Sequence, residues 1–136
     1  NGDMADATDA RKALDQSGAD AVMIGRAALG QPWLVGQVAA ELRSGQAAPA
    51  PSPPEKTDAI TEHYTTLLTI YGKRVGLRHA RKHLAAYCAD AERHGSAAAA
   101  QCRAELVTSE DPDRVLALIQ RLYDGSRDSP LQKEAA

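Results

Sequence analysis

A proline-rich segment divides this chain of 136 residues into two parts. Residues 45–54 have the sequence GQAAPAPSPP and contain four of the seven prolines in the chain. Proline fixes φ and lacks a backbone donor, so such a segment is extended and fairly stiff and continues neither a helix nor a central strand. The sequence therefore predicts one part at residues 1–44, a linker at residues 45–55, a second part at residues 56–124 and a flexible tail at residues 125–136.

The first part has the pattern of a β/α repeat. Asp6 is suited to cap a helix that runs to about Ser17, and Gly18 is suited to end it. Residues 21–24 (AVMI) then form a short apolar run, which is typical of a fully buried parallel strand. A further helix is expected to begin near Pro32, where the missing N–H of proline costs nothing, and to fade before the linker.

The second part has no strand signal and is expected to be all helical. Gly72, the His94-Gly95 pair and the segment before Pro112 separate its apolar stretches. Short connections between amphipathic helices favour a small antiparallel bundle. The predicted fold class is therefore α/β followed by all-α. The four expected helices lie at about residues 56–71, 75–89, 96–106 and 112–124.

The cysteines and the hydropathy exclude several classes of protein. Cys88 and Cys102 are too few for a disulfide framework, and their separation fits no zinc pattern. We expect both to be ordinary helix residues in a reducing compartment, with no metal site. No apolar run approaches the roughly 20 residues that a membrane-spanning helix needs. The expectation is a cytoplasmic monomer that does not associate with membranes.

Two short motifs flank the expected helix and strand of the first part. Asn1-Gly2-Asp3 opens the chain, and Gly25-Arg26 follows the apolar run. A glycine after a strand lets backbone N–H groups approach a phosphate, and a following arginine adds a planar charged fork. In β/α barrels, phosphate is often bound by the loops after the last two strands. Each motif alone is equally compatible with a turn, in which Asp3 caps a helix and Arg26 forms a surface salt bridge.

Positive charge is concentrated in one stretch of the second part. From His63 to Ala89 there is no Asp or Glu, although the chain carries a net charge of −2. At 100° per residue, most of the cations fall on one side of a helix. Such a face is typical of a site for an RNA backbone, and it is also compatible with a solvated face that pairs with acids such as Glu62 or Asp90. The cations are Lys73, Arg74, Arg78, Arg81 and Lys82.

An apolar stripe runs beside these cations and is expected to pack on the bundle. Tyr64 and Tyr71 are seven residues apart and share a helix face, which favours a place in the core over stacking on bases. His63 and His94 are expected to be surface or packing residues rather than ligands. The stripe consists of Leu77, Ala80, Leu84, Tyr87 and Cys88.

The motifs, taken in this order, resemble a known family. Asn-Gly-Asp, a helix, and then GADAVMIGRAALGQPWL at residues 18–34 look like the end of the catalytic barrel of the tRNA-dihydrouridine synthases. Residues 80–87 (ARKHLAAY) resemble a helix of the family's bacterial B-type, nitrogen-regulation-like branch. The resemblance extends from residue 1 to about residue 124. Ala86 departs from it, since the branch commonly has Trp there, and Met4 stands where Ile or Val is usual.

This resemblance implies a fold, a reaction and two sites. Residues 1–44 would be the C-terminal end of an FMN-binding TIM (β/α)8 barrel, and residues 56–124 a helical tRNA-binding domain. The reaction would be reduction of the C5–C6 bond of specific uridines in tRNA with NADPH. The five cations from Lys73 to Lys82 would contact tRNA. In such enzymes the two N-terminal motifs contact FMN, and these roles transfer to Asn1, Gly2, Asp3, Gly25 and, at the phosphate, Arg26.

The resemblance also places the active-site cysteine and a flavin-contacting lysine upstream of this chain. Because the chain begins inside the first motif, we expect it to be the C-terminal part of a longer enzyme, with no catalytic residue of its own and no activity alone. Residues 1–44 are expected to be poorly held, since a buried parallel strand needs cover on both faces. The alternatives are another FMN-dependent barrel oxidoreductase acting on a small molecule, and a non-enzymatic helical RNA-binding or regulatory module.

Overall fold

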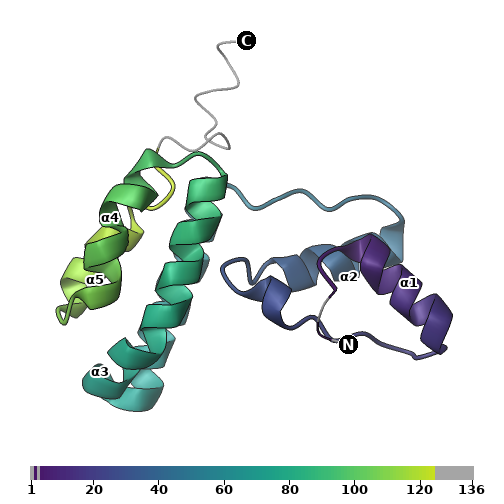
Figure 1. The fold of residues 1–136 in the computed structure, drawn as a ribbon, viewed down its shortest axis with the longest axis horizontal. Coiled ribbons are helices and arrows are strands. Elements are labelled where there is room, and N and C mark those ends of the chain that lie inside the picture. The colour runs from purple at the N-terminus through teal and green to yellow at the C-terminus, as the bar shows by residue number, and fades with distance from the viewer. Residues whose placement is uncertain (1, 3, 125–136) are drawn as a thin grey trace, which may run out of the picture. The chain divides into compact units, whose positions relative to one another are not determined.

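The computed structural model describes residue 2 and residues 4–124. The expected cofactor contacts Asn1 and Asp3, and the expected tail at residues 125–136, lie outside the described residues. The chain forms two compact units, Asn1–Ala50 and Pro51–Ala136, which we call the first and second units. Their elements are labelled in Figure 1, and both units are built mainly from helices.

The first unit contains α1 (Ala7–Ser17), the 3-10 helix η1 (Arg26–Ala28) and α2 (Leu34–Ser44). The Asp6 carboxylate caps α1 by accepting a hydrogen bond from the backbone N–H of Asp9 at 2.8 Å. Gly18 ends α1 in the left-handed region (φ 66°), where its N–H donates to the carbonyl of Leu14 at 2.9 Å. The helix predicted here is therefore confirmed, together with its cap and its end.

The strand expected at residues 21–24 is not formed. Ile24 makes only an isolated parallel bridge to Gly2, whose N–H donates to the carbonyl of Met23 at 2.9 Å. Met23 is 57% exposed. A strand exists through a ladder of hydrogen bonds with its neighbours, and a single described partner residue cannot supply that ladder. The sequence correctly indicated an apolar, non-helical segment at residues 21–24. Among the described residues, however, this segment lacks the strand pairing that would make it part of a sheet.

A small core holds the first unit together. Val22 and Ile24 pack against it, which explains the apolar character of residues 21–24 without a sheet. Gln37 of α2 donates from Nε2 to the carbonyl of Pro49 at 3.1 Å and so fastens the proline-rich segment to the unit. The buried residues of this core are Met4, Ala7, Ala10 and Val38, and Ala13, Leu34 and Leu42 also pack against it.

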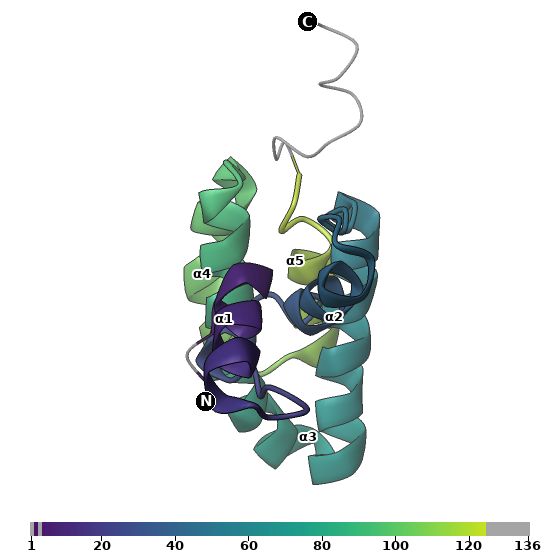
Figure 2. The ribbon, with the colours of Figure 1, turned by 90° about the vertical axis from the view of Figure 1, so that its right-hand side faces the viewer.

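The second unit contains α3 (Pro53–Arg93), α4 (Ala97–Thr108) and α5 (Pro112–Ile119). Gly72 interrupts α3 with non-helical dihedrals (φ 71°, ψ 164°) and divides it into two arms, residues 53–71 and 73–93. The arms double back on each other, as Figures 1 and 2 show, and His63 Nδ1 lies 2.8 Å from the hydroxyl of Tyr87. The two helices predicted on either side of Gly72 are therefore confirmed.

The ends of the helices differ slightly from those expected. The first arm begins at Pro53, inside the predicted linker, because a proline is well suited to the first turn and because Ser52 and Glu55 form a capping box there. Hydrogen bonds from Ser52 lower the pKa of Glu55. Asp111 caps α5, which ends at Ile119 and is followed by turns rather than by the helix expected up to residue 124.

The apolar stripe predicted on the second arm is buried, as expected. Cys88 is fully buried, and burial raises the pKa of its thiol to about 11, so it is a packing residue. Cys102 of α4 is also a buried free thiol. Both α4 and α5 pack on α3 and contribute buried residues of their own, among them Leu106, Val115 and Ile119. All five residues of the stripe have relative exposures of 7% or less: Leu77, Ala80, Leu84, Tyr87 and Cys88.

One buried carboxylate connects the end of α3 to the segment after α5. Asp90 is fully buried and accepts a hydrogen bond from the hydroxyl of Tyr123 at 2.9 Å and another from the guanidinium of Arg93 at 2.9 Å. Burial, followed by the charge of Asp90, raises the pKa of Tyr123. This network is a polar contact inside an otherwise apolar core, so its integrity matters for stability.

Gly76 lies close against the backbone of the first arm, and Gly76→Ala should destabilise the protein. An added Cβ would lie 2.8 Å from the carbonyl oxygen of Leu67 and 2.9 Å from Cα of Leu68. Because these are backbone atoms, the arms must separate, at a cost of about 1–3 kcal/mol. Chemical denaturation followed by circular dichroism measures this loss. Gly36→Ala in α2 is the control, since nothing lies within 4 Å of its added Cβ. A loss of the same size in both variants would contradict the close approach.

Candidate functional site

The structure brings the two N-terminal motifs into contact through their glycines. A Cβ added to Gly25 would lie 3.1 Å from the carbonyl oxygen of Gly2 and 3.3 Å from its Cα. A side chain at Gly25 would therefore push the two backbone segments apart. Gly2 itself has a φ of 89°, which L side chains rarely adopt. Glycine is therefore favoured at Gly2 by its backbone conformation and at Gly25 by the close approach of the two segments.

Arg26 stands directly beside these paired glycines. It is the first residue of η1, whose turn is closed by the N–H of Ala28 donating to the carbonyl of Gly25 at 3.0 Å. The side chain of Arg26 is exposed. Backbone N–H groups at the start of a helical turn, next to a guanidinium, are donors of the kind that a phosphate group needs. The residues present therefore fit a phosphate-bearing cofactor.

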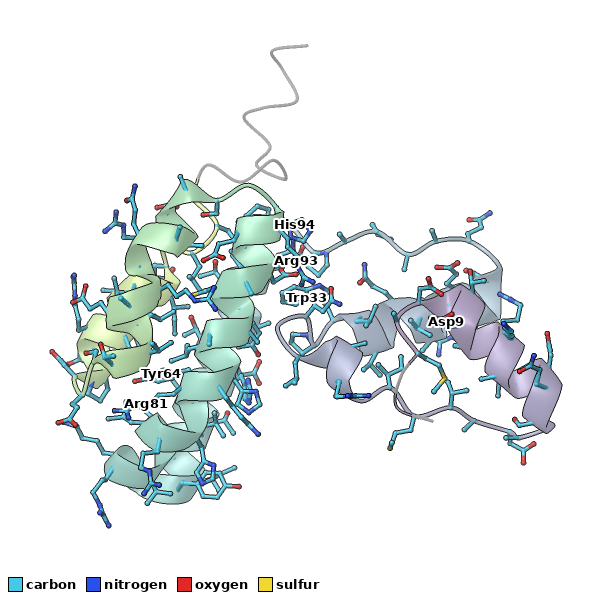
Figure 3. The ribbon with its side chains drawn as sticks, viewed as in Figure 1. Asp9, Trp33, Tyr64, Arg81, Arg93 and His94 are labelled. Carbon is cyan, nitrogen blue, oxygen red and sulfur yellow. The ribbon has the colours of Figure 1, made fainter. Side chains whose placement is uncertain are left out.

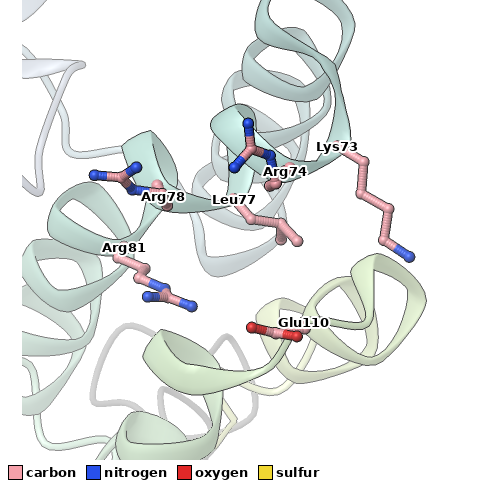
Figure 4. A pocket seen from close by; sticks show the side chains of 6 residues that line it. All are labelled: Lys73, Arg74, Leu77, Arg78, Arg81 and Glu110. Atoms are coloured by element: carbon pink, nitrogen blue, oxygen red, sulfur yellow. The ribbon is translucent and has the colours of Figure 1, made fainter.

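A second candidate site lies in the second unit. A groove of about 410 Å³ runs between the second arm of α3 and the connection from α4 to α5 (Figure 4). We call it the basic groove. Glu110, from that connection, is its acidic residue, and nothing in the sequence pattern had indicated it. Lys82 is exposed but is not among the lining residues. The groove is lined by Lys73, Arg74, Leu77, Arg78, Arg81 and Glu110.

The cations of the second arm are not neutralised by neighbouring carboxylates. Within the part of the chain that the structure describes, none of the five forms an ion pair, and all are exposed. The nearby acids of the unit bind other arginines: Asp90 binds Arg93, and Glu92 binds Arg103 at 3.1 Å. Asp90 was one of the two acids considered as partners for the basic face, and it is used elsewhere. The groove therefore keeps its positive charge.

His63 and His83 do not add to that charge at neutral pH. His63 and His83 lie with ring centroids 4.7 Å apart in the space between the two arms. Burial lowers the pKa of His63. Burial, and then the charges of His63, Lys82 and His79, lower the pKa of His83. Both rings are packing residues, as is His94, whose Nδ1 lies 2.8 Å from the carbonyl oxygen of Asp90.

Of the four tyrosines, Tyr64, Tyr87 and Tyr123 are buried and Tyr71 is exposed. Tyr64 lies inside the second unit (Figure 3), where burial and then the charges of Asp111 and Asp113 raise its pKa to about 12. Tyr87 is also buried. Tyr71, in contrast, is 49% exposed, so the expectation that it shares the core with Tyr64 is wrong. Tyr71 is the last residue of the first arm before Gly72, so it lies at the bend of α3.

No three His, Cys, Asp or Glu side chains among the described residues converge as ligands for a metal ion. None of the helices described combines the length and the apolar character that a membrane crossing requires.

Comparison with known proteins agrees with the sequence resemblance. The family model described as dihydrouridine synthase (Dus) matches residues 1–125. A probable tRNA-dihydrouridine synthase of Rhodobacter capsulatus is 49% identical over 124 residues, which are 90% of this chain and 36% of that protein. A probable tRNA-dihydrouridine synthase of Rickettsia prowazekii is 40% identical, with 90% of this chain and 36% of the relative covered.

A relative with a more specific name is similar over the same length. The tRNA-dihydrouridine synthase B of Xanthomonas axonopodis pv. citri is 41% identical over 91% of this chain and 36% of its own length. The chain thus spans about a third of the length of these curated relatives. The family match extends over the paired glycines and Arg26 of the first unit and over the basic groove of the second. On these grounds the chain belongs to the tRNA-dihydrouridine synthase family.

Proposed function

We propose that this chain is the C-terminal part of an FMN-dependent tRNA-dihydrouridine synthase, which reduces the C5–C6 bond of specific uridines in tRNA with NADPH. The single observation that carries the proposal is the basic groove, because it is an exposed, positively charged surface in a chain of this family. In this proposal residues 1–44 end the FMN-binding barrel and residues 56–124 bind tRNA. The names of the relatives support the same substrate and reaction.

The first unit would hold the phosphate of FMN. Gly2 and Gly25 leave the backbone accessible, and Arg26 supplies a charge that can bind a phosphate through two parallel hydrogen bonds. Asn1 and Asp3 belong to the same proposed site. When bound, FMN supplies the hydride transfer. The role of this part of the chain is to anchor and orient the cofactor.

The second unit would position the tRNA. The four cations of the basic groove would contact successive phosphates, with Lys82 at its margin, and so supply salt-dependent affinity and a fixed orientation. A uridine stacked in folded RNA must leave its stack to reach a buried cofactor, and a firm hold on the backbone helps to offset that cost. We assign no proton donor within the chain, because Cys88 and Cys102 are buried in the helical unit.

The basic groove also separates this proposal from its alternatives. An FMN-dependent barrel oxidoreductase acting on a small molecule would use Gly25 and Arg26 equally well, but it has no need of an exposed cationic groove. A non-enzymatic RNA-binding module would use the groove but not a flavin. Flavin absorbance of the full-length protein, purified from cells, distinguishes the two FMN-dependent enzymes from the non-enzymatic RNA-binding module. Binding of unmodified tRNA then distinguishes the two enzymes.

Replacing Arg26 tests the cofactor site. In the encoded protein, Arg26→Ala should weaken FMN binding about tenfold or more, because a charge-assisted hydrogen bond to phosphate is lost. Titration of FMN fluorescence measures the affinity. Arg43→Ala removes an exposed charge from the same unit and should leave FMN affinity unchanged. Equal FMN affinity in wild type and Arg26→Ala would contradict the assignment of Arg26 to the FMN phosphate.

The proposed activity has its own test. Failure of the full-length protein to form dihydrouridine in an unmodified tRNA with FMN and NADPH would contradict it.

A further inference from the structure

The exposed apolar side chains of the second unit are gathered at the bend of α3. Ile70 is 66% exposed, Tyr71 is 49% exposed and Val75 is 37% exposed. In the described part of this unit, these three are the large hydrophobic residues that face solvent. Exposed apolar residues are unremarkable when they are scattered, but a group confined to one bend marks a surface that binds something.

Tyr71 is held in place by an aromatic partner from the other arm. The ring centroids of Tyr71 and His79 lie 4.7 Å apart, and their planes are tilted by 30°. His79 is exposed as well. The pair therefore forms an aromatic surface that is fixed on one side and open to solvent on the other. Because the rings already hold each other in place, a flat ligand that binds there loses little affinity to side-chain ordering.

This aromatic pair shares the outward side of the second arm with the cations. At 100° per residue, Val75 and His79 follow directly beside Arg78 and Lys82 around the helix, while the buried stripe lies on the opposite side. Lys73 and Arg74, which line the basic groove, come immediately after the bend. Around the helix, Arg78 is the groove-lining residue nearest to His79, whereas Leu77 lies on the opposite side.

We propose that Tyr71 and His79 form a stacking surface for an unpaired base of RNA whose phosphates contact Arg78 and Lys82. An open aromatic ring beside unneutralised cations is the combination that binds single-stranded RNA, because every base has a flat face and every linkage a negative charge. The absence of any Asp or Glu from His63 to Ala89 favours this polyanion over a protein partner of mixed charge. The inference rests on the proposed function insofar as the groove binds RNA.

The test replaces the ring and keeps the apolar bulk. Tyr71→Leu should bind unmodified tRNA and a short single-stranded RNA about tenfold more weakly than wild type. The slope of log affinity against log salt should not change, because no charge is removed. Tyr71→Trp should keep the affinity, and binding of a blunt RNA duplex should be the same in all variants. Fluorescence anisotropy of labelled RNA measures each affinity in the full chain.

Ile70→Ala is the matched control, since it removes a more exposed apolar side chain without a ring. Wild-type affinity of Tyr71→Leu for both RNAs would overturn the stacking surface and leave tRNA binding by the groove intact. Equal losses in Ile70→Ala, Tyr71→Leu and Tyr71→Trp would also overturn it, because they indicate a general apolar contact. Tyr71-dependent binding of single-stranded RNA without binding of tRNA would support the stacking surface and contradict the proposed function. Binding of neither RNA would overturn both.

Discussion

Replacing Arg74, Arg78 and Arg81 together by alanine is expected to weaken tRNA binding about a hundredfold. Each exposed contact between an arginine and a phosphate contributes about 1 kcal/mol once solvent screening is taken into account. The three residues line the same groove and none of them forms an ion pair with another described residue, so their loss leaves no carboxylate unpaired. The effect therefore reports on tRNA contacts rather than on folding.

Salt dependence gives the sharper measurement of this variant. Each phosphate contact that is lost should reduce the slope of log affinity against log salt by about 0.7–0.9, so the triple variant should lose about 2–3. Lys82→Ala is measured separately, since Lys82 is exposed but does not line the groove. We expect it to reduce the tRNA affinity and the salt slope less than the triple variant does. Affinity is measured over a series of salt concentrations with unmodified tRNA.

A matched control removes the same charge from the other unit. Arg11, Lys12 and Arg43 are exposed residues of α1 and α2, and their replacement by alanine changes the net charge by the same amount. This control should bind tRNA far more tightly than the groove variant. Similar losses in the two triple variants would show that overall charge, and not the groove, determines the affinity.

Replacing Asp90 by alanine is expected to cause the largest loss of stability, about 3 kcal/mol. The change removes the acceptor for Tyr123 and leaves that hydroxyl buried without the partner it has in the wild type. It also releases Arg93, which is exposed enough to return to water at little cost. Because a domain is stable by only about 5–15 kcal/mol, this is a large fraction of the total.

Chemical denaturation of two further variants isolates the contact. Tyr123→Phe should lose less than Asp90→Ala, about 1–2 kcal/mol, because the carboxylate keeps its bond to Arg93. The loss of unfolding free energy in the double variant should be smaller than the sum of the losses in the two single variants, as expected for residues in one network. Asp58→Ala, at an exposed position of α3, should be close to neutral. A full additive loss in the double variant would show that Asp90 and Tyr123 act independently.

The parts of the fold that were predicted correctly depend on residues close together in the chain. Asp6 and Gly18 bound α1 and Gly72 interrupts α3, and each acts within one turn of its own position. The burial of the stripe from Leu77 to Cys88 likewise follows from helical periodicity. Such features can be predicted because the hydrogen bonds of a helix join residues only four positions apart.

The incorrect or missed features depend on partners that are distant in the chain. Residues 21–24 have the composition of a strand, but a strand requires neighbouring strands, and Gly2 provides a single bridge. Tyr71 is exposed at the bend of α3, where its arm ends. Glu110 reaches the basic groove because α4 and α5 pack on α3 and bring their connection opposite the second arm. Periodicity carries no information on any of these.

The sequence by itself determined the helices, their caps, the face of α3 that carries the cations and the resemblance to a family. Only the tertiary structure decided that Gly2 and Gly25 meet backbone to backbone, that four of the five cations line one groove, and that Tyr71 faces solvent against His79. The physical reason is the range of the interactions. Helix hydrogen bonds and caps are local, whereas close backbone approach, groove walls and exposure arise from packing between segments that the chain brings together only on folding.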